Sequence, residues 1–326
     1  MTIILDNDQV KSLMTYEMAV DAVEHGFRLD AEGKVGPPER VDIPTGSGWL
    51  RLMAASADGL GLYGFKAMNL TQERGLRYGL WVYDSENGDL LAILDAQAIT
   101  ATRTACAAAV STKYLAPDNV SRLAVIGTGA EARTQLLAMM AVTSPQEVTV
   151  FSRSEENRRD FVESMSSQVD VPLVACETLD EAVAGAEVIA AATKSSVAVL
   201  GSRHIKAGTH VNSVGASRLD QREIDVEAFN CVDVLACDTV AHVAAEAGDV
   251  NAGIEAGVID PADLLSLGEI VVDPTVGRSS PEQVTMYKSV GSAIQDLALA
   301  KVIIENAEGA GLGRDLGEFP HLKPFR

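Results

Sequence analysis

The chain has 326 residues, of which 47% are hydrophobic, and its formal net charge at pH 7 is −20. This length suffices for about two domains with a sizeable core. The acidic balance argues against a nucleic-acid-binding protein, which needs a basic face. An acidic surface of this kind usually keeps a protein soluble, and a charge this large would also suit a salt-rich cytoplasm.

The amino terminus lacks the basic region and long apolar run of a signal peptide, and no apolar stretch reaches membrane-spanning length. The four cysteines show no C-x-x-C spacing, and the five histidines form no metal-binding pattern. These features predict a reduced, cytoplasmic protein with no metal site and no membrane or nucleic-acid partner.

The first third of the chain changes its hydrophobic period. Apolar residues recur at helical spacing between Thr15 and Gly33, and Gly36-Pro37-Pro38 then starts an extended segment. Four strands are predicted after it: Trp49–Ala54, Leu62–Met68, Leu80–Tyr83 and Leu90–Leu94. They form an antiparallel or mixed sheet before any nucleotide motif. We therefore expect a separate domain here and look for the substrate in it.

Cations stand out against this apolar background. Arg40, Arg51 and Lys66 belong to the sheet region, and Arg103 lies in the alanine-rich helix predicted over 96–116. Lys66 is either at a solvated edge or in a pocket, and Arg51 has the same alternatives. The small neighbours of Arg103 leave space around a guanidinium, which suits a carboxylate held by two parallel hydrogen bonds. The alternative for Arg103 is a surface position.

Residues 122–134 carry a nucleotide signal. The apolar run Leu123–Ile126 predicts a buried strand, and the turn into a helix that follows it is Gly127-Thr128-Gly129-Ala130-Glu131-Ala132. This is G-x-G-x-x-A, in which the first glycine makes the tight turn and the second lets a pyrophosphate approach the backbone. The small alanine lets the helix pack on the strand. We predict cofactor contacts from all six residues; a glycine-rich turn without a nucleotide is the alternative.

The end of the next strand, Glu147–Phe151, bears on the choice of cofactor. About 20 residues beyond the fingerprint, an acidic residue would bind the ribose hydroxyls of NAD. Here the sequence is Ser152-Arg153-Ser154, whose hydroxyls and arginine suit a 2′-phosphate. NADP(H) is therefore the preferred prediction and NAD(H) the alternative. Arg153 could also stack over adenine or point to solvent.

An alternation of strands and helices continues beyond this point. The predicted strands are Val171–Ala175, Val188–Ala192, His210–Val214 and Val232–Ala236. Ligands of such sheets bind at the carboxyl ends of the strands. We therefore expect Thr193, Val214, Gly215 and Ala216 on the cofactor and Ser217 near the reacting atoms, with ordinary loops as the alternative.

Several motifs in this order resemble the ornithine cyclodeaminase/mu-crystallin family, from near the start of the chain to about Gly313. They are Arg103-Thr104-Ala105, the fingerprint of 127–132, Gly215-Ala216-Ser217 followed by Arg222-Glu223-Ile224-Asp225, and Lys288-Ser289-Val290-Gly291 with Asp296-Leu297-Ala298.

The resemblance implies an α/β fold in which a Rossmann domain is inserted into an α+β substrate-binding and dimerisation domain. The boundaries would be 1–117 plus 293–326 for the substrate domain and 118–292 for the Rossmann domain. The resemblance also implies a homodimer. Lys66, Arg103 and Arg40 would grip the α-carboxylate of a small amino or imino acid.

The same resemblance places the segment after Lys288 at the site, with Ser289 and Val290 on the cofactor and Gly291 on the substrate. Cyclodeaminases carry an aspartate two residues after the glycine of the Gly215 motif, where this chain has Ser217. Their acidic residue on the substrate sheet is also missing, with Arg51 near its place. If Arg51 reaches the pocket, it could bind a second carboxylate of the substrate.

These departures favour a reductase of 2-imino acids that uses NADP(H) or NAD(H) and, in reverse, oxidises an α-amino acid. Lys66, Arg103 and Ser217 are the predicted catalytic residues, and a proton donor could be Lys66, Ser217 or a water. A cyclodeaminase that recycles NAD without net oxidation and a non-catalytic crystallin-like binding protein are the alternatives.

Overall fold

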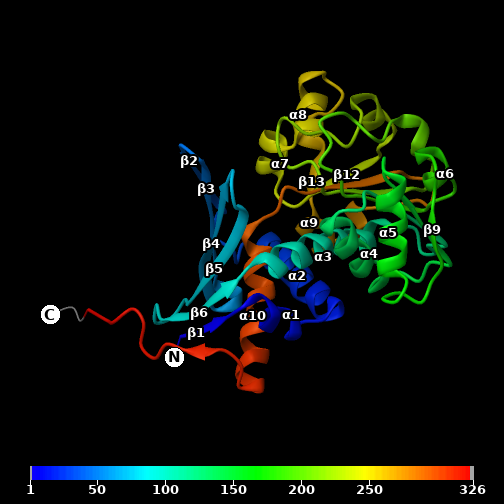
Figure 1. Ribbon diagram of the computed structural model, residues 1–326. Coiled ribbons are helices and arrows are strands. Elements are labelled where there is room, and N and C mark those ends of the chain that lie inside the picture. The colour runs from blue at the N-terminus through cyan, green and yellow to red at the C-terminus, as the bar shows by residue number, and fades with distance from the viewer. Residues whose placement is uncertain (1, 324–326) are drawn as a thin grey trace. The chain divides into compact units, whose positions relative to one another are not determined.

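A computed structural model describes residues 2–323 and divides the chain into two compact units (Figure 1). The first unit comprises Met1–Arg103 and Ser292–Arg326, and the second, Thr104–Gly291, is inserted into it. The division falls inside helix α3 (Gln97–Leu115). Residues 104–117, which the sequence analysis assigns to the first domain, therefore lie with the second unit. There Ser111 and Thr112 hydrogen-bond to His210 and Asn212.

The first unit is built on a mixed sheet in the order β15-β1-β6-β5-β4-β3-β2. Its strands are β1 (Ile3–Leu5), β2 (Glu39–Thr45), β3 (Gly48–Ala57), β4 (Leu62–Thr71), β5 (Gly75–Asp84), β6 (Leu90–Asp95) and β15 (Arg314–Asp315). Only the β1–β6 pair among these is parallel. The helices are α1 (Asn7–Ser12), α2 (Tyr16–Ala31), the short turn η1 (Asp58–Leu60) and α10 (Ala293–Ala310).

Helix α10 packs on α2 and against β3, β4 and β5. Glycines permit this close approach. A Cβ on Gly26 of α2 would lie 3.1 Å from the Cβ of Ala298, and one on Gly64 would lie 3.1 Å from Leu297. Because alternate residues of a strand share a face, Gly64 and Lys66 both face α10. The packing thus brings the first turn of α10 over Lys66.

The second unit contains a sheet in the order β13-β12-β14-β11-β10-β7-β8-β9, and all its pairs are parallel. The strands are β7 (Arg122–Ile126), β8 (Glu147–Phe151), β9 (Leu173–Ala175), β10 (Val188–Ala191), β11 (His210–Ser213), β12 (Val234–Cys237), β13 (Leu264–Ser266) and β14 (Thr285–Lys288). The α-helices are α4 (Ala130–Met140), α5 (Glu155–Met165), α6 (Leu179–Val183), α7 (Val240–Glu246), α8 (Gly248–Glu255) and α9 (Leu267–Val272). Short 3₁₀ turns are η2 (Ser202–His204), η3 (Val226–Cys231), η4 (Pro261–Asp263) and η5 (Pro274–Val276).

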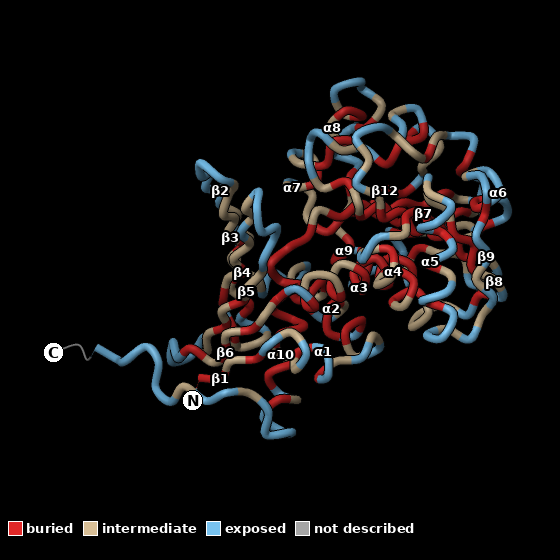
Figure 2. The backbone as a smooth tube through the Cα atoms, viewed as in Figure 1, coloured by how far each residue is buried: buried red, intermediate tan, exposed pale blue. Residues whose placement is uncertain are grey.

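This topology has a switch point. The chain runs from β7 outward through β8 and β9, and then crosses to β10 on the other side of β7. Open α/β sheets bind their ligands outside the carboxyl ends of the strands at such a point. The central strands β7, β10, β11 and β12 are buried almost throughout (Figure 2), as parallel strands covered on both faces should be.

The predicted inserted α/β architecture is confirmed, and each predicted strand is present with shifts of a few residues at its ends. Strand β2 was expected only as an extended segment. It is charged, contains Pro44 and lies at the edge of its sheet, where proline is tolerated. Within residues 2–323, none of the helices is long and apolar enough to span a membrane.

Candidate functional site

In the first unit, a buried carboxylate joins two of the predicted cations. The Lys66 ammonium lies 2.9 Å from Oδ1 and 2.7 Å from Oδ2 of Asp296. The Arg103 Nε donates to the same Oδ1 over 3.2 Å, and its Nη1 donates to Oε1 of Gln295 over 2.8 Å. The side chains of Lys66 and Asp296 are fully buried, and that of Arg103 is 6% exposed. Strand β4, helix α3 and helix α10 thus contribute one charged group each.

The strand register also places Arg40 and Arg51 on the face that carries Lys66. Arg40 pairs with Met53 across β2 and β3, and Met53 pairs with Lys66 across β3 and β4. Directly opposed residues point to the same side of a sheet, so Arg40 and Lys66 share it. Arg51 is two residues from Met53 and follows the same alternation. Its guanidinium forms two 2.6 Å hydrogen bonds to Asp42, which opposes it on β2.

Electrostatics inside this group act mainly on Lys66. Burial lowers the pKa of Lys66 to about 8, the Asp296 carboxylate opposes that shift, and the positive charges of Arg103 and Arg40 add to it. Burial disfavours the ammonium form because the interior solvates a charge poorly. Lys66 is therefore protonated at neutral pH and loses its proton about 2.5 pH units earlier than an exposed lysine would.

In the second unit, the fingerprint turn has the geometry that a pyrophosphate needs. Gly127 has a φ of +114°, and a Cβ there would lie 2.5 Å from the Ala192 carbonyl oxygen. A Cβ on Gly129, the residue that caps α4, would meet nothing within 4 Å. Gly129 has no side chain with which to cap this helix end, and the backbone N–H groups at the start of a helix suit an anion. These observations fit a dinucleotide cofactor.

The end of β8 follows the predicted pattern of hydroxyls and arginine. Ser154 caps α5 by accepting from the Asn157 N–H, and the Ser152 hydroxyl donates to the Ser154 carbonyl. Arg158 donates to the Ser152 carbonyl over 2.6 Å and lies over the Phe151 ring, whereas Arg153 is exposed. A cavity of about 380 Å³ nearby is lined by Glu155, Arg158, Arg159, Ala175 and Glu177.

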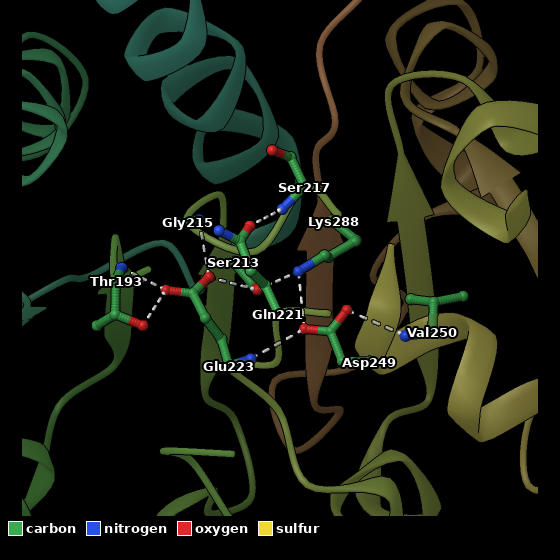
Figure 3. Close-up of polar contacts among 9 residues, drawn as sticks. All are labelled: Thr193, Ser213, Gly215, Ser217, Gln221, Glu223, Asp249, Val250 and Lys288. Atoms are coloured by element: carbon green, nitrogen blue, oxygen red, sulfur yellow. Dashed lines mark hydrogen bonds and ion pairs between the residues drawn. The ribbon is translucent and has the colours of Figure 1, made fainter. Parts of the chain in front are cut away.

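The loops after β10 and β11 meet on one buried carboxylate, that of Glu223 (Figure 3). The Thr193 N–H and hydroxyl donate to Oε1 over 2.5 and 2.9 Å, and the Ser213 hydroxyl and Gly215 N–H each donate to Oε2 over 2.8 Å. The structure therefore brings together Thr193 and Gly215, two of the predicted cofactor residues. Val214 and Ala216 flank Gly215 and are buried. Ser217 is half-buried, and its N–H donates to Gln221.

A second carboxylate holds the segment after β14. Asp238 accepts from the Ser289 hydroxyl over 2.7 Å, from the Gly291 N–H over 2.6 Å and from the Val290 N–H over 3.3 Å. Gly291 has a φ of +84°, a conformation that favours glycine. Asp238 thus holds all three of the predicted site residues that follow Lys288.

The carboxylates Asp296, Glu223 and Asp238 organise the predicted residues, and none of the three is itself among the predicted site residues. For Asp296, a lone acid in an apolar segment, the sequence left open a position at the site or a complement to the helix dipole, and Glu223 was only part of a motif. A signal was available for two of them: Asp296 lies in an otherwise apolar helix, and Asp238 directly follows strand β12. Among residues 2–323, no group of three or more histidine, cysteine or carboxylate side chains is arranged to hold a metal ion.

Comparison with known proteins adds an independent observation. The model of the ornithine cyclodeaminase/mu-crystallin family matches residues 1–311. The chain belongs to this family.

Several relatives are similar over nearly the whole chain. Alanine dehydrogenase of Archaeoglobus fulgidus is 33% identical, over 98% of this chain and 99% of that protein. Ketimine reductase mu-crystallin of Macropus fuliginosus is 32% identical, over 88% and 90% of the two proteins. The structure of Thermococcus litoralis Δ1-pyrroline-2-carboxylate reductase with NADH and L-proline matches with a TM-score of 0.91 at 30% identity, over 96% of this chain and 100% of that one.

The buried charge cluster yields a stability prediction. Asp296→Asn removes the acid that Lys66 and Arg103 share and leaves two buried cations uncompensated, so we expect the free energy of unfolding to fall by about 3–5 kcal/mol. Urea denaturation measures this loss. Asp42→Asn is the control, because it breaks the partly exposed pair with Arg51 and should cost less than about 1 kcal/mol. Equal losses in the two variants would contradict a special dependence on Asp296.

Proposed function

We propose that this protein is a nicotinamide-dependent reductase of 2-imino acids that, in reverse, oxidises an α-amino acid. The observation that carries the proposal is the convergence of Lys66 and Arg103 on one buried carboxylate, in a chain that also holds a dinucleotide fingerprint turn. The relatives support it, since alanine and proline both carry a carboxylate next to a carbon bonded to nitrogen.

In this mechanism, Lys66 and Arg103 bind the substrate carboxylate. Each charge-assisted hydrogen bond contributes about 1.5–3 kcal/mol. The larger effect is orientation, because holding the carboxylate at two points fixes the C=N carbon that is bonded to it. Asp296 and Gln295 hold the guanidinium of Arg103 in place before substrate arrives. When bound, the nicotinamide supplies the hydride.

The imine nitrogen needs a proton to become a good electrophile. Of the two side chains predicted for this step, Lys66 is better suited than Ser217. Burial lowers the pKa of its ammonium to about 8, which makes it a stronger acid near neutral pH than an exposed lysine. The same lysine would then hold the carboxylate and be the proton source.

A substrate panel tests the proposed reaction. We expect NADPH or NADH to be oxidised with cyclic imines next to a carboxylate, or with mixtures of 2-oxo acids and amines, as followed by nicotinamide absorbance. Arg103→Ala should raise KM and lower kcat, because it removes both binding and orientation. If ornithine releases ammonia and no imine oxidises either cofactor, the protein is a cyclodeaminase and the reductase proposal is wrong.

The pH dependence of turnover tests the function of Lys66. Since the ammonium form binds the carboxylate and its pKa is about 8, we expect kcat/KM to fall as the pH rises through 8. Lys66→Arg keeps its charge to far higher pH, so the fall near pH 8 should disappear even if the variant is less active. The partly exposed Lys301→Arg is the control and should retain the fall. A Lys66→Arg profile that still falls at pH 8 would assign the titration to another group.

For the cofactor, we propose a preference for NADP(H) over NAD(H). The exposed Arg153 beside two hydroxyls at the end of β8 supports it, because a guanidinium suits a 2′-phosphate. Arg153→Asp replaces the cation proposed for the 2′-phosphate by an anion, so it should raise the Kd for NADPH by about tenfold or more. The Kd for NADH should stay within a few-fold, as measured by fluorescence titration. Arg159→Asp, on helix α5 six residues further along the chain, is the control. Equal weakening of both cofactors by Arg153→Asp would refute the preference.

We also propose that the chain forms a homodimer through the sheet of the first unit. On the face opposite Lys66, Val41, Ile43 and Tyr63 are 38–49% exposed, and aromatic pairs stack in rows there. Strand β2, which carries Val41 and Ile43, is also an edge strand. An apolar sheet face with an open edge is a typical association surface.

The double variant Val41→Lys/Ile43→Lys tests this interface. Two charges on the apolar face should convert a dimer into a monomer in light scattering. Val174→Lys, at a 39% exposed position in the second unit, should leave the mass unchanged. A wild-type monomer, or a double variant that stays dimeric, would rule the interface out.

A further inference from the structure

The cluster around Glu223 contains more charge than loop positioning requires. The Lys288 ammonium donates to the Ser213 hydroxyl over 2.9 Å and to Oδ2 of Asp249 over 2.7 Å. The same Oδ2 accepts the Glu223 N–H, and Oδ1 accepts the Val250 N–H (Figure 3). Lys288, Asp249 and Glu223 are all 0% exposed. In this water-excluded interior, Lys288 therefore contacts Asp249 directly and is linked to Glu223 through Ser213.

The pattern of donors fits ionised acids. Each oxygen of Glu223 accepts one backbone N–H and one hydroxyl, and a carboxylate is the form that only accepts. Asp249 likewise accepts from an ammonium and from two backbone N–H groups. With one cation between two anions, the cluster carries a net charge of −1.

The position of this charge is fixed by backbone packing. A Cβ on Gly215 would lie 1.9 Å from the Thr193 carbonyl oxygen and 2.5 Å from Oε1 of Glu223. The loops after β10 and β11 are therefore locked onto the carboxylate with no space for a side chain. They lie on the switch-point side of the sheet, at the carboxyl ends of parallel strands.

We propose that the Glu223–Lys288–Asp249 cluster favours binding of the oxidised cofactor over the reduced one, with Glu223 as the positioning residue. The inference rests on the proposed function. The nicotinamide ring carries a positive charge when oxidised and is neutral when reduced, while the phosphates are the same in both forms. A net negative charge buried beneath the cofactor loops therefore attracts the ring only when it is oxidised, and so favours the oxidised form over the reduced one. Screening there is weak because water is excluded. The cluster thereby influences how readily the enzyme binds the cofactor for amino-acid oxidation relative to imine reduction.

The test compares two affinities in one protein. Glu223→Gln keeps the shape of the side chain but removes its charge. The new amide also points an N–H group at donors of the loops, which loosens the loops. This loosening should weaken the binding of both cofactor forms by the same factor. Titration of the full-length protein with the oxidised and the reduced cofactor gives both Kd values, by calorimetry and fluorescence. We expect the ratio of the oxidised to the reduced Kd to rise about tenfold, or about 1.4 kcal/mol.

Ser213→Ala is the matched control, since it breaks the same network at its centre without a change of charge and should weaken both forms by one factor. If Glu223→Gln fails to fold, Asp249→Asn removes a charge from the same cluster and should raise the ratio. An unchanged ratio in the charge-removing variant, or an equal rise in Ser213→Ala, overturns the inference. A wild-type protein that binds neither form would instead overturn the proposed function.

Discussion

A buried charge must be paired, because removing it from water costs several kcal/mol that only a close partner offsets. The first unit satisfies this constraint with a single acid for two bases, Lys66 and Arg103. Helix α10 has to deliver Asp296 to a strand and a helix from the other end of the chain. That requirement explains why the last helix belongs to the first unit, and why Gly26 and Gly64 leave room for its approach.

The second unit meets a related constraint with the charges reversed. Loops at the carboxyl ends of parallel strands leave backbone N–H groups without ladder partners, and unsatisfied buried donors are costly. Glu223 accepts two of these N–H groups, and Asp238 accepts two others. The acids hold the loops in one conformation, and charge that stabilises the backbone is then also available to act on a ligand.

The sequence predicted what is encoded locally. The fingerprint glycines and the alternation of strands and helices can be recognised within short windows, and both are present in the structure. Isolated cations on apolar strands can be recognised too, but their sequence left open whether they lie in a pocket or at the surface. The acids that organise them could not be assigned this way. Asp296 is 230 residues from Lys66 and 193 from Arg103, so only the tertiary fold shows the pairing. Strand β2 was missed for a related reason, since an edge strand with proline and charges lacks a strong pattern.

The cluster of Lys66, Arg103 and Asp296 has a local charge of the sign that an anionic substrate needs. The chain as a whole carries −20, a field that repels anions at long range. Around Asp296, Lys66 and Arg103 leave one positive charge in excess, and Arg40 adds another close enough to act on the pKa of Lys66. An incoming carboxylate removes part of that excess and relieves the repulsion among the three cations. Burial is the main reason that the pKa of Lys66 is depressed, and the excess of positive charge adds to it. A bound carboxylate would offset that second contribution, so the binding of an anion should raise the pKa of Lys66.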